Sequence, residues 1–379
     1  MGNAFEKPEK LSRVKIAKSS CEEREIEFFA YGSKSTSFFS NRSFQSNRTN
    51  FSVSSVRCSK TRWPRPSHIT IFITHFKLSS EEQKFTKQTL IAKGAFGTVI
   101  KVLDECNQEY ALKILKKSLI IQENCVEQIK TEVDIHKVCS HHPFIATFIA
   151  CWQNRHNVFI LSEYVPKGEL FNKICNFSFE LIRLYVAEIS LALDFLHNAG
   201  IIYRDLKPEN ILLSENYHIK LIDFGLSKWL KIGNRTKTIC GTFQYMAPEI
   251  LREEYYDHAA DWWSLGVITC RMLLNEYPDI RTILNSESII KIGTDQSEMK
   301  YNVDLNFFPY EFDCLSSEAK DLLKRLLNLN PKNRINSVLK LTRIAFFKNF
   351  NFKLEALQQM LPNMLEQEVI KNNMIPIYV

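Results

Sequence analysis

The sequence predicts an α+β fold in which strands come first and helices follow. Apolar runs within residues 90–165 have the length and flanking residues of buried strands. Longer amphipathic stretches predict helices at residues 125–138, 179–197, 258–267, 316–327 and 337–347. With 379 residues, the chain can form one large bilobal domain or two ordinary domains, and either can bury a core.

Residues 1–70 are predicted to be a disordered, basic N-terminal region. Ser, Asn, Arg and Lys dominate residues 33–67, and no helical or strand period recurs there. The region holds 13 Lys and Arg against six Glu and no Asp, a surplus of seven that equals the net charge of +7. The remainder is therefore close to neutral, which gives no support for nucleic-acid binding by the main domain.

The first residues, Met-Gly-Asn-Ala, predict that Gly2 becomes available for N-myristoylation after Met removal. Position six is Glu instead of the preferred Ser or Thr, so an ordinary start is the alternative. A single acyl chain binds membranes marginally. The basic surplus of residues 1–70 could supply the second signal for peripheral membrane contact.

Cysteine and hydropathy patterns predict a cytoplasmic protein without a transmembrane segment. The ten cysteines include no Cys-x-x-Cys pair, which argues against a structural zinc site and a disulfide framework. No stretch approaches the roughly 18–20 uninterrupted apolar residues of a spanning helix, and the N-terminus lacks the apolar centre of a secretory signal. Residues 71–85 are interpreted as a lead-in segment to the folded part.

A strand–loop–strand pattern at residues 90–102 predicts a phosphate-binding loop. Gly94 and Gly97 lie between two apolar strands, where glycine lets the backbone approach a phosphate group closely. An ordinary glycine-containing hairpin is the alternative.

Lys113 lies in the next predicted strand, residues 109–115. A lysine in an apolar strand is costly to bury unless it is paired. Glu132, in the amphipathic stretch at residues 125–138, is its predicted partner. The alternatives are a lysine that reaches solvent and a glutamate on a solvated helix face.

Two polar loops between apolar runs carry the candidate chemistry. The first, residues 203–210, contains Asp205, Lys207 and Asn210. A loop that combines a possible base, a cation and an amide suits phosphoryl transfer. The second loop contains Asp223, and Asn210 and Asp223 offer the hard oxygen ligands that Mg²⁺ prefers. An ordinary polar surface loop is the alternative for either loop taken alone.

Together, these segments resemble the motifs of protein kinases over about residues 86–350. The resemblance includes Asp-Phe-Gly from Asp223, Ala-Pro-Glu ending at Glu249, and an arginine, Arg334, that pairs with that glutamate in kinases. Three details narrow the resemblance to a subgroup of protein kinases. They are Tyr203 before Arg-Asp, Lys207, and the segment Thr-Lys-Thr-Ile-Cys-Gly-Thr. The chain looks like serine/threonine kinases related to cyclic-AMP-dependent kinase and protein kinase C, and most like the ribosomal protein S6 kinase-related proteins.

The resemblance implies a bilobal protein kinase fold, with a small β-rich N-lobe containing one key helix and a larger, mainly helical C-lobe. The domain would cover residues 86–350, and residues 351–379 would form a short C-terminal tail. ATP, Mg²⁺ and protein substrates with Ser or Thr are the implied partners. The implied ATP contacts in the glycine loop are Ala92, Lys93, Gly94, Ala95, Phe96, Gly97, Thr98 and Val99. Further ATP contacts would come from Ala111, Glu163, Val165 and Leu212.

The resemblance also implies a role for each polar residue. Asp205 would accept the proton of the substrate hydroxyl, and Lys207 would steady the moving phosphoryl group. Asn210 and Asp223 would hold Mg²⁺. Lys113, held by Glu132, would orient the α- and β-phosphates.

Regulation and substrate choice are implied at a second set of positions. Thr238 would be phosphorylated by an upstream kinase, and its phosphate would pair with Arg204 and Lys228. Glu169 and Glu209 would accept arginine in basic substrates. The alternative for both glutamates is a merely solvated position.

Three departures from the family pattern bear on activity. Ala92 stands where the glycine loop of the family has its first glycine. Relatives usually end in an aromatic motif that docks on the N-lobe and braces the helix of the key glutamate. Here residues 347–352 have the aromatic spacing but no phosphorylatable residue, and are expected to pack locally. His136 is polar where an aliphatic residue usually couples the lobes. A kinase-fold scaffold with weak or no catalysis is therefore the alternative function, and a membrane-recruited adaptor governed by residues 1–70 could coexist with either.

Overall fold

The structure, a computed structural model, describes residues 76–174, 177–286, 307–360 and 362. All of them belong to one unit, which comprises residues 37–379. The predictions for residues 1–70, including Gly2, lie outside the described residues, as does most of the tail after residue 360. Within the described residues, no helix is long and apolar enough to cross a membrane.

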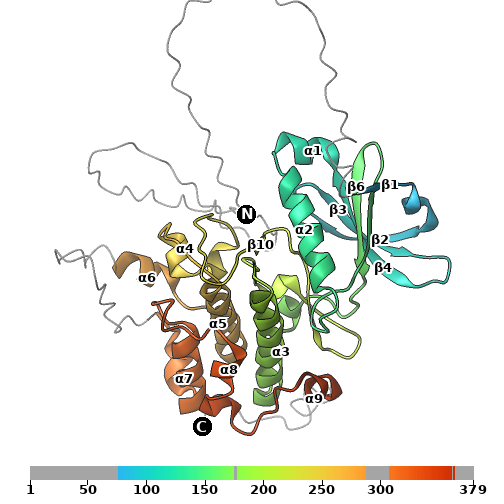
Figure 1. Cartoon of the computed structure of the whole chain (residues 1–379). Coiled ribbons are helices and arrows are strands. Elements are labelled where there is room, and N and C mark those ends of the chain that lie inside the picture. Colours follow the sequence, from blue (N-terminus) through green and yellow to red (C-terminus); the bar gives the residue numbers. More distant parts are fainter. Residues whose placement is uncertain (1–75, 175–176, 287–306, 361, 363–379) are drawn as a thin grey trace, which may run out of the picture. The chain divides into compact units, whose positions relative to one another are not determined.

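The N-lobe is built on one six-stranded sheet with the strand order β1-β5-β6-β4-β3-β2 (Figure 1). Antiparallel pairing joins all neighbours except β1, which pairs parallel to β5. The strands are β1 (Lys77–Leu78), β2 (Thr86–Lys93), β3 (Gly97–Leu103), β4 (Glu109–Lys116), β5 (Phe148–Gln153) and β6 (Asn157–Glu163).

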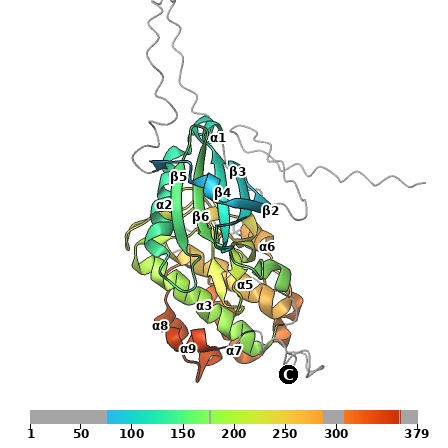
Figure 2. The same cartoon turned by 90° about the vertical axis from the view of Figure 1, so that its right-hand side faces the viewer.

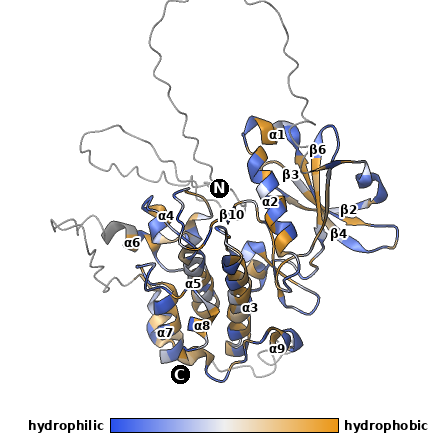
Figure 3. Ribbon diagram, in the orientation of Figure 1, coloured by the Kyte–Doolittle hydropathy of each residue, from blue (hydrophilic) through white to orange (hydrophobic). Residues whose placement is uncertain are grey.

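Two helices accompany this sheet, α1 (Lys117–Gln122) and α2 (Val126–Cys139). The sequence predicted only the second, because the short α1 directly continues strand β4 and shows no helical period of its own. Hydrophobic and hydrophilic residues both occur along α2 (Figure 3). Its buried apolar residues include Ile129 and Val133, which join the N-lobe core.

The C-lobe is mainly helical, and its core forms around α3 (Phe179–Asn198) and α5 (Ala259–Leu274). Figure 2 shows the strands of the sheet above these two helices. Helix α3 begins where the Ser178 hydroxyl accepts a hydrogen bond from the Leu181 N–H at 3.1 Å. The remaining helices are α4 (Pro248–Leu251), α6 (Ile280–Ser286), α7 (Ser317–Leu326), α8 (Val338–Leu341) and α9 (Leu354–Gln359). Short 3-10 helices occur at Glu81–Lys84, Leu170–Lys173, Pro208–Asn210, Phe243–Tyr245, Tyr310–Cys314 and Ala345–Phe347.

Two small antiparallel pairs frame the polar loops that carry the candidate chemistry. Strand β7 (Ile201–Ile202) pairs with β10 (Lys228–Trp229), and β8 (Ile211–Leu213) pairs with β9 (Ile219–Leu221). The loop at residues 203–210 connects β7 to β8, and the loop at residues 222–227 connects β9 to β10. Buried apolar residues in β7, β8 and β9 therefore anchor both loops in the C-lobe core.

The aromatic cluster at the end of the domain packs within the C-lobe. Phe347 is buried, and its ring lies 5.6 Å from that of Phe350 and 4.9 Å from that of Phe352. Phe346 contacts Phe179 at the start of α3, with ring centroids 4.8 Å apart. The expectation of local packing is confirmed.

An ion pair deep in the C-lobe fixes the Ala-Pro-Glu segment. Two nitrogens of Arg334 donate to the Glu249 carboxylate at 2.7 and 3.0 Å, and the two side chains are 0% and 2% exposed. Arg334 also donates to the carbonyls of Ala259 (2.9 Å) and Asn328 (3.0 Å). Its guanidinium is thus satisfied on every side that the structure describes, as a buried charge requires.

Arg334→Ala is expected to lower the free energy of unfolding by about 3–5 kcal/mol, because it leaves a buried carboxylate unpaired. The matched control is Arg325→Ala. Arg325 pairs with Asp321 at 2.8 Å, but its side chain is 57% exposed, so the expected loss is below about 1 kcal/mol. Urea unfolding of both variants tests this. Similar losses would contradict the assigned importance of the Glu249–Arg334 pair.

Candidate active site

The backbone of the loop at residues 203–210 is held by a buried carboxylate, that of Asp261 in α5. Asp261 accepts hydrogen bonds from the backbone N–H groups of Tyr203 (2.9 Å) and Arg204 (2.8 Å), and its Oδ2 lies 2.8 Å from His197 Nε2. Arg204 has a φ of +70°, in the left-handed region that a non-glycine residue rarely adopts. Asp261 therefore stabilises the turn that places Asp205.

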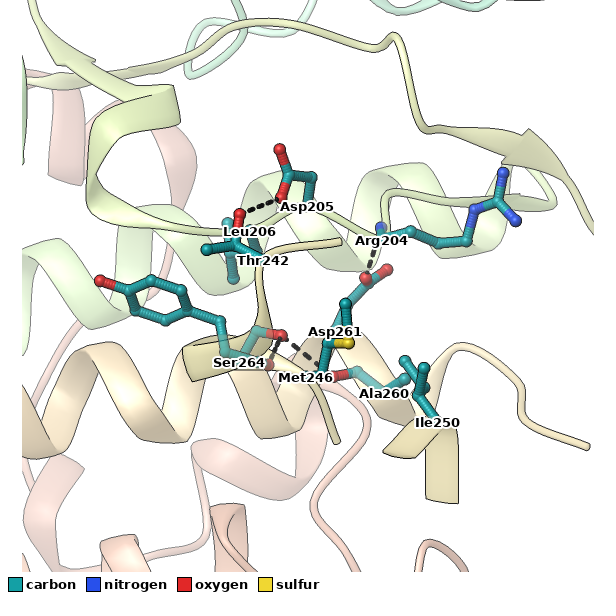
Figure 4. Close-up of a pocket in the computed structure, with 10 residues that line it drawn as sticks. Arg204, Asp205, Leu206, Thr242, Met246, Ile250, Ala260, Asp261 and Ser264 are labelled. Atoms are coloured by element: carbon teal, nitrogen blue, oxygen red, sulfur yellow. Dashed lines mark hydrogen bonds between the residues drawn. The ribbon is translucent and has the colours of Figure 1, made fainter. Parts of the chain in front are cut away.

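Asp205 lies at the centre of a group of donors. Lys207 Nζ contacts its Oδ2 at 2.8 Å, Asn210 Nδ2 contacts the same oxygen at 3.0 Å, and the Thr242 hydroxyl donates to Oδ1 at 2.8 Å. Lys207 also donates to the Thr242 hydroxyl oxygen at 3.0 Å. Figure 4 shows Asp205 and Thr242 beside the small pocket that both help to line, with Asp261.

The environment of Asp205 acts on its pKa in two directions. Burial raises the pKa of the carboxyl group, and Lys207 and Thr242 lower it in part, so that the net shift is upward. A base that is held near donors yet retains a raised pKa suits proton acceptance from a hydroxyl group.

Lys113 links strand β4 to two carboxylates from different parts of the chain. Its Nζ lies 2.5 Å from Glu132 Oε1 on α2 and 3.2 Å from Asp223 Oδ1. Burial opposes the ammonium form, but Asp223 and Glu132 outweigh it and raise the pKa of Lys113. Lys113 therefore remains a cation, and the structure brings it together with its predicted partner.

Asn210 and Asp223 present oxygen atoms in a manner that fits a hard cation. Asn210 donates its side-chain N–H groups to the carbonyl (2.9 Å) and carboxylate of Asp205, which leaves its amide oxygen as an acceptor. Asp223 is 47% exposed, and Lys113 lowers the pKa of its carboxyl group. Mg²⁺ is usually bound by one or two such groups together with substrate phosphates.

The glycine loop connects β2 and β3, and all eight residues predicted to bind phosphate lie on it or at its flanks. Ala92 pairs with Val99 and Lys93 with Thr98, and the Gly94 N–H donates to the Gly97 carbonyl at 2.9 Å. A Cβ atom at Gly97 would lie 1.8 Å from the Ile114 carbonyl oxygen on β4. Gly97 is therefore required by strand packing, whereas a Cβ atom at Gly94 would meet no atom closer than 4.0 Å.

The residues predicted to border the adenine lie on β4, β6, β8 and the segment after β6. Glu163 ends β6, and its carboxylate pairs with Lys220 at 2.7 Å. Val165 is buried, and its backbone N–H and carbonyl have no hydrogen-bond partner among the described residues. Ala111 and Leu212 are half-buried.

Four aromatic rings connect the loop at residues 203–210 to the N-lobe. Tyr203 contacts Phe224 edge to face at 5.6 Å, Phe224 stacks on His136 at 5.2 Å, and His136 contacts Phe148 at 5.5 Å. Burial lowers the pKa of His136, and its Nε2 lies 2.8 Å from the Ala146 carbonyl oxygen. His136 is thus a neutral ring with its polar atom satisfied, which allows it to take the place of an aliphatic residue.

The segment around Thr238 lies near two basic residues. Thr238 itself is exposed, while Thr236 is buried and its hydroxyl accepts a hydrogen bond from Lys228 at 3.1 Å. Arg204 donates through Nε to the Leu226 carbonyl at 2.6 Å, and its buried Nη1 has no hydrogen-bond partner among the described residues. Lys228 therefore contacts Thr236, and Arg204 retains an unused donor.

The two predicted substrate-binding glutamates are brought close enough to influence each other. Burial raises the pKa of Glu209, and the negative charge of Glu169 adds to that effect. Glu209 Oε2 is buried without a hydrogen-bond partner among the described residues. An acidic pair with an unsatisfied oxygen offers a place for a cationic group.

Comparison with known proteins decides the family. The protein kinase domain family matches residues 85–347. The chain belongs to the protein kinase family. It is 36% identical over 303 residues to human ribosomal protein S6 kinase-related protein, which covers 78% of this chain and 70% of that protein. It is also 36% identical over 287 residues to serine/threonine-protein kinase AtPK1/AtPK6 of Arabidopsis thaliana.

A further comparison agrees with the resemblance to relatives of protein kinase C that the sequence motifs indicated. The chain is 35% identical over 294 residues to atypical protein kinase C of Drosophila melanogaster. The matched regions cover only 58% of the Arabidopsis protein and 46% of the Drosophila protein, so the chain spans about half the length of these two relatives. The serine/threonine kinase type, with ATP as the phosphoryl donor, and the bilobal α+β fold predicted from the sequence are confirmed.

Sequence reasoning missed two residues that position the catalytic loop of this kinase. Thr242 lies in the segment that served only to identify the subgroup, and nothing in its spacing indicates contact with Asp205. Asp261 lies at the start of an apolar helix. A carboxylate there, next to two tryptophans, is costly to bury without partners. This cost was the signal in the sequence that Asp261 binds other groups.

Thr242→Val is expected to raise the pKa of Asp205, because the carboxylate loses one hydrogen bond. A general base acts in its deprotonated form, so activity is present above its pKa and is lost as the pH falls. The acid limb of the kcat–pH profile should therefore move to higher pH. Thr242→Ser, which keeps the hydroxyl group, is the matched control. If the two profiles coincide, Thr242 does not tune Asp205.

Proposed function

We propose that this kinase transfers the γ-phosphoryl group of ATP to Ser or Thr hydroxyl groups of protein substrates in basic sequence contexts. The observation that carries this proposal is the hydrogen-bonded group around Asp205, in which an ammonium, an amide and a hydroxyl group lie within 3.0 Å of the carboxylate that would act as the base. Such a preorganised group favours catalysis, since phosphoryl transfer depends on alignment and charge neutralisation.

Each residue has a distinct part in this proposal. Asp205 orients the substrate hydroxyl and accepts its proton, and Lys207 neutralises charge on the phosphoryl group as it moves. Lys113 binds the α- and β-phosphates from the opposite side, and the ion pair with Glu132 at 2.5 Å keeps its ammonium in place. The glycine loop at residues 92–99 covers the phosphates with its backbone N–H groups.

Asn210 and Asp223 would hold Mg²⁺, through the amide oxygen of the first and the exposed carboxylate of the second. The ion would supply positive charge next to the phosphates. The lowered pKa of Asp223 keeps its carboxylate ionised in the range where kinases act.

Glu169 and Glu209 are the proposed contacts for arginine in the substrate. Burial raises the pKa of both carboxyl groups because it disfavours their charged form. A cation bound next to them would stabilise that charged form. Peripheral membrane contact through Gly2 and the basic residues 1–70, in a cytoplasmic protein, completes the proposal from the sequence.

Asp205→Asn is expected to lower kcat at least about 100-fold while leaving ATP binding within about twofold, because it removes the base and retains the shape. The measurement is phosphate transfer from ATP to a peptide library in which the residues before Ser or Thr vary in charge. Wild-type transfer that favours basic peptides supports the proposal. Transfer no greater than that of Asp205→Asn would instead support the kinase-fold scaffold.

Thr238→Ala is expected to lower the activity of the kinase isolated from cells about tenfold or more, because the phosphate that would pair with Arg204 and Lys228 is lost. Thr236→Ala is a poor control, since Thr236 is buried. Thr282→Ala, a change at a half-buried position on α6 outside this segment, is the better one. Mass spectrometry would establish the phosphate on the wild-type protein. Equal activity of Thr238→Ala and wild type would remove Thr238 from the switch.

A further inference from the structure

The segment just before the kinase domain, residues 76–84, is attached to the open edge of the N-lobe sheet. Strand β1 pairs parallel to β5, with Lys77 opposite Trp152, and the Ser79 N–H donates to the Gln153 carbonyl at 3.0 Å. Glu82 accepts hydrogen bonds from Trp152 Nε1 and Asn154 Nδ2, both at 2.9 Å. Backbone and side-chain bonds therefore attach this segment to the edge at several successive points.

Phe76 enters the core at the start of this segment. It is 1% exposed and belongs to the cluster that joins β4, α1, α2 and β6. Its carbonyl oxygen accepts a hydrogen bond from Gln153 Nε2 at 2.6 Å. Gln153 in turn accepts one from the buried Lys117 of α1. Both the ring and the backbone of Phe76 are thus fixed beside the two N-lobe helices.

The cluster that contains Phe76 adjoins both members of the Lys113–Glu132 pair. Leu115, a member of the cluster, lies two residues after Lys113 and on the same face of β4, since side chains alternate along a strand. On α2, the members Ile129 and Val133 lie four residues apart on one face. Glu132 directly precedes Val133, about 100° around the helix. When Phe76 and the other cluster members pack against Ile129 and Val133, they fix the rotation of α2 about its own axis. That rotation determines the direction in which Glu132 points.

We propose that Phe76 and β1 form a built-in brace that positions α2, so that residues 76–84 set the geometry of the Lys113–Glu132 pair. In this proposal, which rests on the proposed function, Phe76 is a positioning residue that acts through the helix. The brace comes from the N-terminal side of the domain. The aromatic cluster at residues 346–352 packs against α3 in the C-lobe.

The test compares full-length Phe76→Ala, Phe76→Leu and Leu78→Ala. Leu78 lies on the same strand but is 58% exposed, so its replacement leaves the buried cluster intact. Hydrogen exchange of backbone amides is measured in α2 and, as a reference, in α3. For Phe76→Ala, α2 amides should exchange at least about tenfold faster than in wild type, while α3 amides remain within about twofold. Leu78→Ala should match wild type in both helices.

Kinase activity gives the second readout. Phe76→Ala should lower kcat about tenfold, with KM for the peptide within about twofold, and Leu78→Ala should leave both unchanged. Phe76→Leu, which keeps most of the buried apolar area, should fall between wild type and Phe76→Ala. It becomes the deciding variant if the alanine protein does not fold.

Unchanged hydrogen exchange of α2 in the Phe76 variants would overturn the brace. Equal acceleration of exchange in α2 and α3 would also overturn it, because that would indicate a general loss of stability. Activity that falls without faster exchange in α2 would overturn it as well. A wild-type protein that transfers no phosphate would defeat the proposed function instead, and hydrogen exchange would still decide on the brace.

Discussion

The contact between Lys113 and Glu132 is the constraint on which the arrangement of the active site depends. It joins strand β4 to helix α2 at 2.5 Å, and Lys113 continues to Asp223 at 3.2 Å. Three segments far apart in sequence therefore meet at one ammonium group. A pair of this kind contributes little net stability when it is desolvated. Its value lies in geometry, since Lys113 meets Glu132 and Asp223 together only if α2 keeps its position.

In the C-lobe, the loops of the active site are held in position by buried charges that are fully paired. Asp261 accepts hydrogen bonds from two backbone N–H groups of the loop at residues 203–210, and Arg334 binds Glu249 of the Ala-Pro-Glu segment. Each charge would be costly if a partner were missing. The catalytic loop and the Ala-Pro-Glu segment are consequently fixed to one rigid helical core. The N-lobe holds the Lys113–Glu132 pair beside a smaller core, and the position of the pair relies more on packing.

The motif residues could be predicted from the sequence, but the residues that hold them in position could not. Lys113, Asp205, Asn210 and Asp223 were recognisable because they stand in segments that resemble the motifs of protein kinases, in the same order along the chain. Thr242 and Asp261 were missed because their contacts depend on tertiary geometry. Thr242 lies 37 positions after its partner Asp205, and Asp261 lies 57 positions after its partner Arg204. Strand β1 was missed because two residues carry no period. Interpreting residues 71–85 as a lead-in overlooked the burial of Phe76.

Helix α2 is the element at which these supports converge. One face carries Ile129 and Val133 into the cluster with Phe76, while His136 contacts Phe224, the residue next to Asp223. Because His136 is neutral and its Nε2 lies beside the Ala146 carbonyl, it can stack on Phe224 and meet Phe148 edge to face without a desolvated charge. The polar residue that raised doubt about coupling between the lobes therefore maintains it. The orientation of Glu132 is then fixed from both sides, by the aromatic stack toward the C-lobe and by Phe76 toward the sheet edge.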